Sequence, residues 1–222
     1  MMDDWLRPTA FVDSNALEVV AFARKTVGSE TDPRRRAVAL YYAVRDGVTY
    51  TPYCDYRSLE TYRASSVLAK GAGFCVGKAA LLAAAARAEG IPARLRFADV
   101  RNHLCTPRLR ELMGGDVFVY HGYVELELEG RWVKATPAFD LALCERFGVV
   151  PLEFDGREDS IFQPYDRAGR RHMEYLRDRG VHADVPAAEI VEAFARDYPR
   201  LAERGAPAPA TRFREEAGET PR

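Results

Sequence analysis

The spacing of apolar and polar positions along the chain predicts helices near the N-terminus, strands in the middle and helices again toward the C-terminus. In the segment Thr31-Asp32-Pro33, Asp32 suits a helix N-cap and Pro33 suits the first helical position. The helical patterns cover residues 16–27, 33–44, 65–70, 74–89, 141–147, 168–179 and 187–198, and the strand-like patterns cover 48–53, 91–100, 117–129 and 131–136. Because the helices mainly precede the strands and do not alternate with them, the pattern predicts an α+β fold with helices packed on an antiparallel β-sheet.

The strands 117–129 and 131–136 are expected to form a β-hairpin. If Glu129-Gly130 is a two-residue loop, Leu128 pairs with Arg131 and the register of the whole hairpin follows. A three-residue loop would turn every side chain to the opposite face, and Pro137 interrupts strand pairing. The predicted helices 141–147 and 168–179 that follow this hairpin are expected to be exposed.

The chain is expected to form one domain over residues 1–200, followed by a tail over residues 201–222. Its 222 residues are 47% hydrophobic, which is enough for a substantial core. The tail contains the sequence Ala-Pro-Ala-Pro-Ala and few apolar residues, and is therefore expected to be disordered. No internal repeat divides the chain further.

Charge and apolar content limit the classes of partner. Lys and Arg total 32 against 33 Asp and Glu, a formal net charge of −1, which argues against a nucleic-acid-binding protein. The longest apolar run, residues 79–86, is far shorter than the roughly 20 residues of a membrane-spanning helix. The N-terminal segment has no apolar stretch typical of a signal peptide, so the sequence predicts a cytoplasmic protein. Nothing in it indicates an oligomeric state.

The cysteines and histidines show no metal-binding spacing. No Cys-x-x-Cys pair and no His-Glu-x-x-His motif occurs. The sequence therefore predicts free thiols, no metal and no cofactor. The four cysteines are Cys54, Cys75, Cys105 and Cys144.

Cys75 is the strongest candidate for a reactive group. It follows Gly71-Ala72-Gly73-Phe74 and falls in the first turn of the predicted helix 74–89. Unpaired backbone N–H groups and the helix dipole favour a thiolate at that position. Cys75 is therefore either an activated nucleophile or an inert buried thiol.

His121 lies in the predicted strand 117–129, whose first half is apolar on both faces, so we expect the imidazole to be enclosed. It is either a catalytic base or a hydrogen-bonded core histidine. In the two-residue-loop register, Thr136 and Asp140 are its diagonal neighbours on one face. Asp140 could stabilise an imidazolium by charge, whereas Thr136 could only orient the ring.

Four segments of the chain together resemble the transglutaminase-like superfamily, over about residues 40–140. The segments are Gly73 to Leu82, Arg87 to Arg94, His121 to Leu126 and Gly130 to Val133. The resemblance implies a papain-like fold and a Cys-His-Asp triad, with Cys75 as nucleophile and His121 as base. The position of the family's aspartate is occupied by Thr136, ahead of Pro137. Asp140 is therefore our predicted third member, with Thr136 as the alternative.

Further residues are candidates for the substrate cleft. Tyr50 and Tyr53 lie on a loop that could contribute to an oxyanion hole or line the cleft. Asn102 and His103 follow a predicted strand and either line the cleft or belong to a solvated loop. The charged stretch 166–172 is expected to be a salt-bridged surface rather than a cover for the cleft.

The sequence thus predicts a cysteine-dependent enzyme acting on a peptide or another amide-containing substrate through a thioacyl intermediate. Hydrolysis, as a peptidase or amidase, is favoured over cross-linking, and an acyltransferase would use the same residues. The alternative is a binding module that keeps the fold and has lost the full triad, which Thr136 in the acidic position favours.

Overall fold

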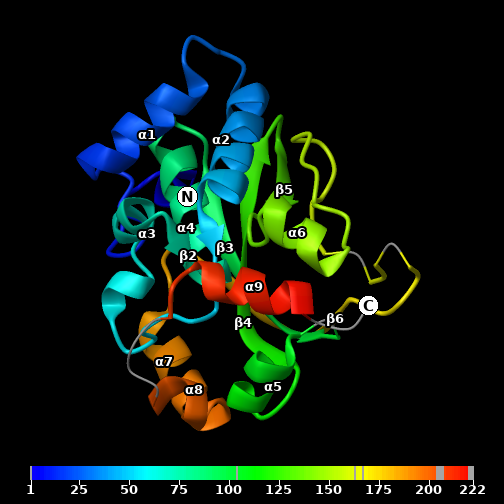
Figure 1. Cartoon of the computed structure of the whole chain (residues 1–222). Helices are drawn as coiled ribbons and strands as arrows, with labels where there is room; N and C mark the ends of the chain where they lie inside the picture. Colours follow the sequence, from blue (N-terminus) through cyan, green and yellow to red (C-terminus); the bar gives the residue numbers. More distant parts are fainter. Residues whose placement is uncertain (1, 104, 163, 167, 204–207, 220–222) are drawn as a thin grey trace.

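The structure is a computed structural model that describes residues 2–103, 105–162, 164–166, 168–203 and 208–219 (Figure 1). The helices are α1 (Leu17–Val27), α2 (Pro33–Gly47), α3 (Ala64–Lys70), α4 (Cys75–Ala88), α5 (Pro107–Met113), α6 (Leu141–Phe147), α7 (Ala187–Asp197), α8 (Pro199–Glu203) and α9 (Thr211–Glu219), with 3-10 turns at Met2–Trp5 and Leu59–Thr61. The strands are β1 (Thr49–Tyr50), β2 (Ala72–Gly73), β3 (Ala93–Asn102), β4 (Val117–Leu128), β5 (Arg131–Ala135) and β6 (Met173–His182). None of the described helices is long and apolar enough to cross a membrane.

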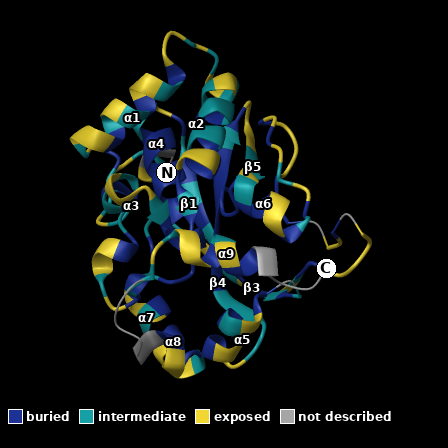
Figure 2. Cartoon of the chain, in the orientation of Figure 1, coloured by how far each residue is buried: buried dark blue, intermediate teal, exposed yellow. Residues whose placement is uncertain are grey.

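Helix α4 lies at the centre of the molecule. Every residue from Cys75 to Arg87 is buried, and Figure 2 shows the helix enclosed by its neighbours. Its alanine side chains are small, so helices α1 to α3 and strands β3 and β4 all approach it closely. At Gly77 a Cβ atom would lie 2.9 Å from the carbonyl oxygen of Thr61, so this approach requires a glycine.

The main sheet has the order β5-β4-β3-β6, and all neighbouring strands are antiparallel. Strands β3 and β4 pack on α4. The predicted α+β class, with helices on an antiparallel sheet, is confirmed.

The hairpin of β4 and β5 has the predicted register. Leu128 pairs with Arg131 across a two-residue loop. Glu129 and Gly130 have φ angles of 54° and 80°, and positive values at both positions are typical of the type I′ turn that matches strand twist.

The hairpin ends earlier than the sequence predicts. Pairing stops at Ala135, and the N–H of Thr136 donates instead to the carbonyl oxygen of Ser160 at 3.0 Å. Pro137 follows and has no N–H for a strand ladder. The expectation that the register continues opposite His121 is therefore wrong.

Strand β6 occupies a segment for which a helix was expected. Residues 168–179 have a helix-like pattern, but Met173–His182 pairs with β3 at the edge of the sheet. The segment carries charged residues such as Glu174 and Arg177 and lacks the alternation of a half-buried strand. Apart from Met173, no side chain of β6 is buried on either face, so the strand needs no alternation of apolar and polar residues.

The C-terminal segment also departs from expectation. Within the tail 201–222, which was expected to be disordered, Thr211–Glu219 forms α9 and buries Phe213 against α6. Helix α6, in turn, was expected to be exposed, but it buries Leu143 and Phe147. Residues 204–207 and 220–222 of the tail lie outside the described residues.

Candidate active site

Cys75 is the first residue of α4, as the sequence predicts. Helix α3 ends at Gly71, whose φ of 61° is the left-handed conformation that glycine adopts readily. Residues Ala72-Gly73 then pair in parallel with Thr49–Tyr50, and extended Phe74 leads into the helix. This short strand pair fixes the direction in which the chain enters α4 and places Cys75 beside the Tyr50 loop.

The thiol of Cys75 is buried, with 6% of the residue exposed. Burial raises the pKa of the Cys75 thiol to about 11, although backbone N–H groups of Gly122, Val76 and Cys75 itself lie close to the sulfur and oppose the shift. The N–H groups predicted from the helix start are therefore present, but the loss of water outweighs them. At that pKa the group is a neutral thiol near pH 7 in this conformation, which agrees with the buried-thiol alternative. Its role as an activated nucleophile stays a prediction.

The start of α4 lies directly against β4 at the position after His121. A Cβ atom on Gly122 would lie 3.0 Å from the Cα of Val76, so the two backbones are in contact. The same Gly122 supplies an N–H toward the sulfur of Cys75. The structure therefore brings the nucleophile candidate next to the strand segment that carries the base candidate.

His121 is enclosed, as predicted, with 4% exposed. Burial lowers the pKa of its imidazole to about 4, so the ring is neutral near pH 7. Its ring packs on Phe162, with centroids 5.4 Å apart. Its Nε2 is buried and has no hydrogen-bond partner among the described residues, Cys75 included. One ring nitrogen is thus free to accept a proton.

Asp140 is bound to other groups than His121. Its Oδ1 accepts from the N–H of Leu143 at 2.9 Å as the N-cap of α6, and also from Arg214 at 3.0 Å. Its Oδ2 accepts from the N–H of Tyr50 at 3.0 Å. Within the described chain no hydrogen bond joins Asp140 to His121, because the hairpin register that would align them ends before it. Its orienting role has no contact in this conformation and stays a prediction.

Thr136, the alternative third member, is buried beside the end of the hairpin. Its backbone is held at both ends, since its N–H donates to Ser160 and its carbonyl oxygen accepts from the Tyr41 hydroxyl at 3.2 Å. Its Oγ1 is buried and has no hydrogen-bond partner among the described residues. The side chain therefore retains hydrogen-bonding capacity that the surrounding protein does not use.

The two tyrosines predicted for the oxyanion hole or cleft lie in different surroundings. Tyr50 lines a small cavity together with Cys75, but its N–H is engaged by Asp140. Tyr53 donates its hydroxyl to Glu216 and so faces α9. The N–H groups close to the sulfur come from α4 and from Gly122. Apart from its place after a candidate histidine, no sequence feature points to Gly122.

The cavity next to Cys75 is closed. Its volume is about 20 Å³, roughly the space of one water molecule. Phe194, Tyr198 and Leu201 of the segment from α7 to α8 cover one side of it. In this conformation the space beside the sulfur holds no group larger than a water molecule.

Lys78 lies one turn after Cys75 and is fully buried, although no sequence pattern indicates burial of this lysine. Its Nζ donates to the carbonyl oxygens of Arg45 at 2.8 Å and Val48 at 2.6 Å. Burial lowers the pKa of Lys78 to about 7, while the nearby Asp140 carboxylate opposes that shift. Lys78 thus fixes the end of α2 and the chain that leads to Tyr50.

Comparison with known protein families identifies the family of this chain. Residues 20–137, more than half of the chain, match the transglutaminase-like superfamily. The chain therefore belongs to the transglutaminase-like superfamily, and the resemblance found in the sequence motifs is confirmed.

Two solved structures are similar to this chain, each at 18% sequence identity. A candidate cysteine protease from Cytophaga hutchinsonii has a TM-score of 0.48, with 82% of this chain and 54% of that protein covered. A candidate protease from Parabacteroides distasonis has a TM-score of 0.42, with 64% of this chain and 26% of that protein covered. The chain thus spans about half and about a quarter of their lengths. No curated protein matches it.

Proposed function

We propose that this chain is a cysteine-dependent enzyme that acts on the amide bond of a peptide or similar substrate. The observation that carries the proposal is the position of the Cys75 sulfur at the start of α4, close to the N–H of Gly122. Gly122 directly follows His121, whose Nε2 has no hydrogen-bond partner among the described residues. Membership in the transglutaminase-like superfamily supports it.

The chemistry starts from a neutral thiol and a neutral imidazole. His121 takes the proton of Cys75 as the sulfur bonds to the carbonyl carbon, and returns that proton to the nitrogen as the C–N bond breaks. The N–H groups of Val76 and Gly122 lie close to the sulfur. They would stabilise the negative charge that develops on the carbonyl oxygen. Water then releases the acyl group in a hydrolase, or an amine accepts it in an acyltransferase. Asp140 or Thr136 would orient His121 after a change in local conformation.

The test is acyl transfer from p-nitrophenyl acetate to the protein, read by mass spectrometry of its peptides. We expect an acetyl group on Cys75, and we expect the His121→Gln variant to acetylate at least tenfold more slowly. Cys54→Ser is the matched control, because the Cys54 thiol donates to the carbonyl oxygen of Thr51 and does not line the cavity of Cys75. It should leave acetylation of Cys75 unchanged. Equal acetylation of several cysteines, or a rate independent of His121, would contradict the proposal.

A binding module is the second candidate function, because Thr136 occupies the position of the family's aspartate and no described carboxylate binds His121. In that case Cys75→Ala would bind peptides as the wild type does, and the wild type would form no acyl-enzyme.

A further inference from the structure

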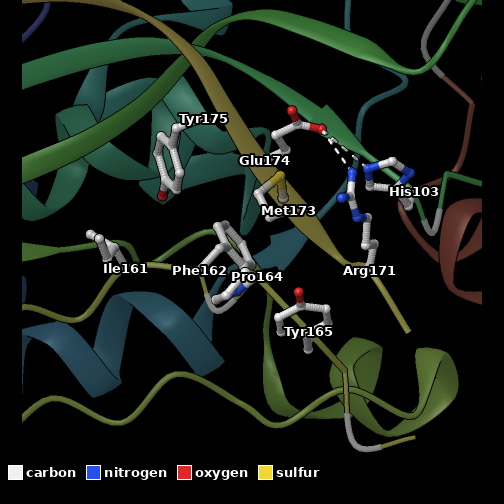
Figure 3. A pocket seen from close by; sticks show the side chains of 9 residues that line it. All are labelled: His103, Ile161, Phe162, Pro164, Tyr165, Arg171, Met173, Glu174 and Tyr175. Atoms are coloured by element: carbon white, nitrogen blue, oxygen red, sulfur yellow. Dashed lines mark ion pairs between the residues drawn. The ribbon is translucent and has the colours of Figure 1, made fainter. Parts of the chain in front are cut away.

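A cavity of about 460 Å³ lies between β6 and the segment that precedes it (Figure 3). Its volume is in the range of small-molecule binding sites. The lining residues are His103, Ile161, Phe162, Pro164, Tyr165, Arg171, Met173, Glu174 and Tyr175. Most of these side chains are apolar or aromatic, and Figure 3 shows them surrounding a common space.

One side chain connects this cavity with the candidate active site. Phe162 lines the cavity and also packs on the ring of His121, with centroids 5.4 Å apart. Phe162 is 5% exposed and is held by further contacts to Phe139 and His172. The ring of Phe162 therefore lies between the cavity and the imidazole of His121.

Charged groups gather at one end of the cavity. Glu174 pairs with His103 at 3.6 Å and with Arg171 at 4.0 Å, as the dashed lines in Figure 3 show. At 4.0 Å the ion pair between Glu174 and Arg171 is too long for a hydrogen bond. The guanidinium of Arg171 can therefore donate its N–H groups to an oxygen atom of a bound ligand. The cavity thus combines apolar walls with donors at one end.

We propose that this cavity binds the amine side of the amide substrate, and that this side carries a bulky apolar side chain. The inference rests on the proposed function. The acyl half of the substrate stays on Cys75, whereas the base must return a proton to the departing nitrogen. The departing half therefore passes beside His121, and Phe162 and the cavity behind it lie there. The apolar walls fit an aromatic or large aliphatic side chain, and Arg171 fits the carbonyl oxygen of the same residue.

The first test is direct binding, followed by NMR of the full chain. The probe is L-phenylalanine amide, and glycine amide is the matched ligand without a side chain. We expect L-phenylalanine amide to shift the amide signals of residues 173–175 and to bind at least tenfold more tightly than glycine amide. Equal shifts with both ligands, or no shifts, would overturn the proposal.

Variants locate the binding. Ile161→Trp fills the cavity and should weaken binding of L-phenylalanine amide at least tenfold, whereas Val150→Trp, at an exposed position outside the cavity, should not change it. Tyr165→Ala removes an exposed wall residue, so folding should be unaffected, and should weaken binding about threefold. Unchanged binding in both cavity variants would overturn the proposal.

A second measurement separates this inference from the proposed function. The acetyl-enzyme on Cys75 should transfer its acetyl group to L-phenylalanine amide faster than to glycine amide, and Ile161→Trp should remove that preference. If Cys75 is acetylated but L-phenylalanine amide does not bind, the proposed enzyme function stands and the proposal for the cavity is overturned. Binding without any acetyl-enzyme overturns the assignment to the amine side and contradicts the proposed function as well.

Discussion

At Cys75 two opposing effects act on the same sulfur. Backbone N–H groups from α4 and Gly122 favour the thiolate, and enclosure by aromatic side chains favours the thiol. Burial of His121 itself keeps the imidazole neutral, with a pKa of about 4. A preformed thiolate–imidazolium pair requires the opposite order of the two pKa values, so the closed conformation holds no such pair.

This order of pKa values makes a prediction for the reactivity of Cys75. Below a pKa of about 11 the thiolate fraction rises tenfold per pH unit. We therefore expect alkylation of Cys75 by iodoacetamide to accelerate about tenfold per unit between about pH 7 and pH 10. Peptide mass spectrometry at each pH gives the rate. A rate that stays constant from about pH 5 to pH 8 would show a thiolate stabilised by imidazolium and would contradict the prediction.

At the scale of elements, local signals predicted helices better than they predicted strand ends. Asp32 caps α2 as expected, because its side chain accepts from the N–H of Arg35, three residues away. The end of β5 depends instead on Ser160, which is distant in sequence, so no hairpin rule could predict it. The sequence-based pairing of Asp140 with His121 depended on extending that hairpin. In the structure the carboxylate of Asp140 instead accepts hydrogen bonds from α6, Tyr50 and α9.

The contact between β4 and α4 can be tested at Gly122. Gly122→Ala places a methyl group 3.0 Å from the Cα of Val76, so the strand and the helix must separate. We expect the free energy of unfolding to fall by about 2 kcal/mol, as in other overpacked cores, and acetylation of Cys75 to slow. Urea denaturation and the acetylation assay measure the two effects.

Gly47→Ala is the matched control, because a Cβ there meets no atom within 4 Å. It should change the stability by less than about 1 kcal/mol. If Gly122→Ala changes the free energy of unfolding and the acetylation of Cys75 no more than this control does, the close approach of β4 and α4 is not needed for stability or for the reactivity of Cys75.

At the scale of the whole molecule, the segment from α7 to α8, which lies outside the family match, covers the cavity of Cys75. The match ends at residue 137, whereas α7, α8 and α9 follow it. Figure 1 shows α7 and α8 at the lower end of the molecule and α9 across its front. The motifs at Cys75 and His121 could be recognised from the sequence because they are local. The cover could not, because Phe194 and Leu201 have the same apolar character as any core residue.

The hydroxyl group of Tyr198 helps to hold this cover on the sheet. Tyr198 at the end of α7 donates its hydroxyl to the carbonyl oxygen of Val117 at 2.7 Å and accepts from the N–H of Val119 at 2.6 Å. Val119 and Tyr198 both line the cavity of Cys75. Tyr198→Phe leaves the N–H of Val119 without an acceptor in the closed state, which costs about 1–3 kcal/mol, whereas water satisfies it when the cover opens.

We therefore expect Tyr198→Phe to raise the open population and the rate of iodoacetamide alkylation at Cys75 about tenfold, since 1.4 kcal/mol is a factor of ten. Tyr42→Phe is the matched control, because the Tyr42 hydroxyl also accepts a backbone N–H, that of Phe154, and donates to a carboxylate, that of Glu153. Tyr42 lies on α2 and does not line the cavity of Cys75, so the loss of its hydroxyl should leave the alkylation rate of Cys75 unchanged. Equal rates in the wild type and both variants would mean that reagents reach the sulfur without movement of α7, and the cover would then have no part in access to Cys75.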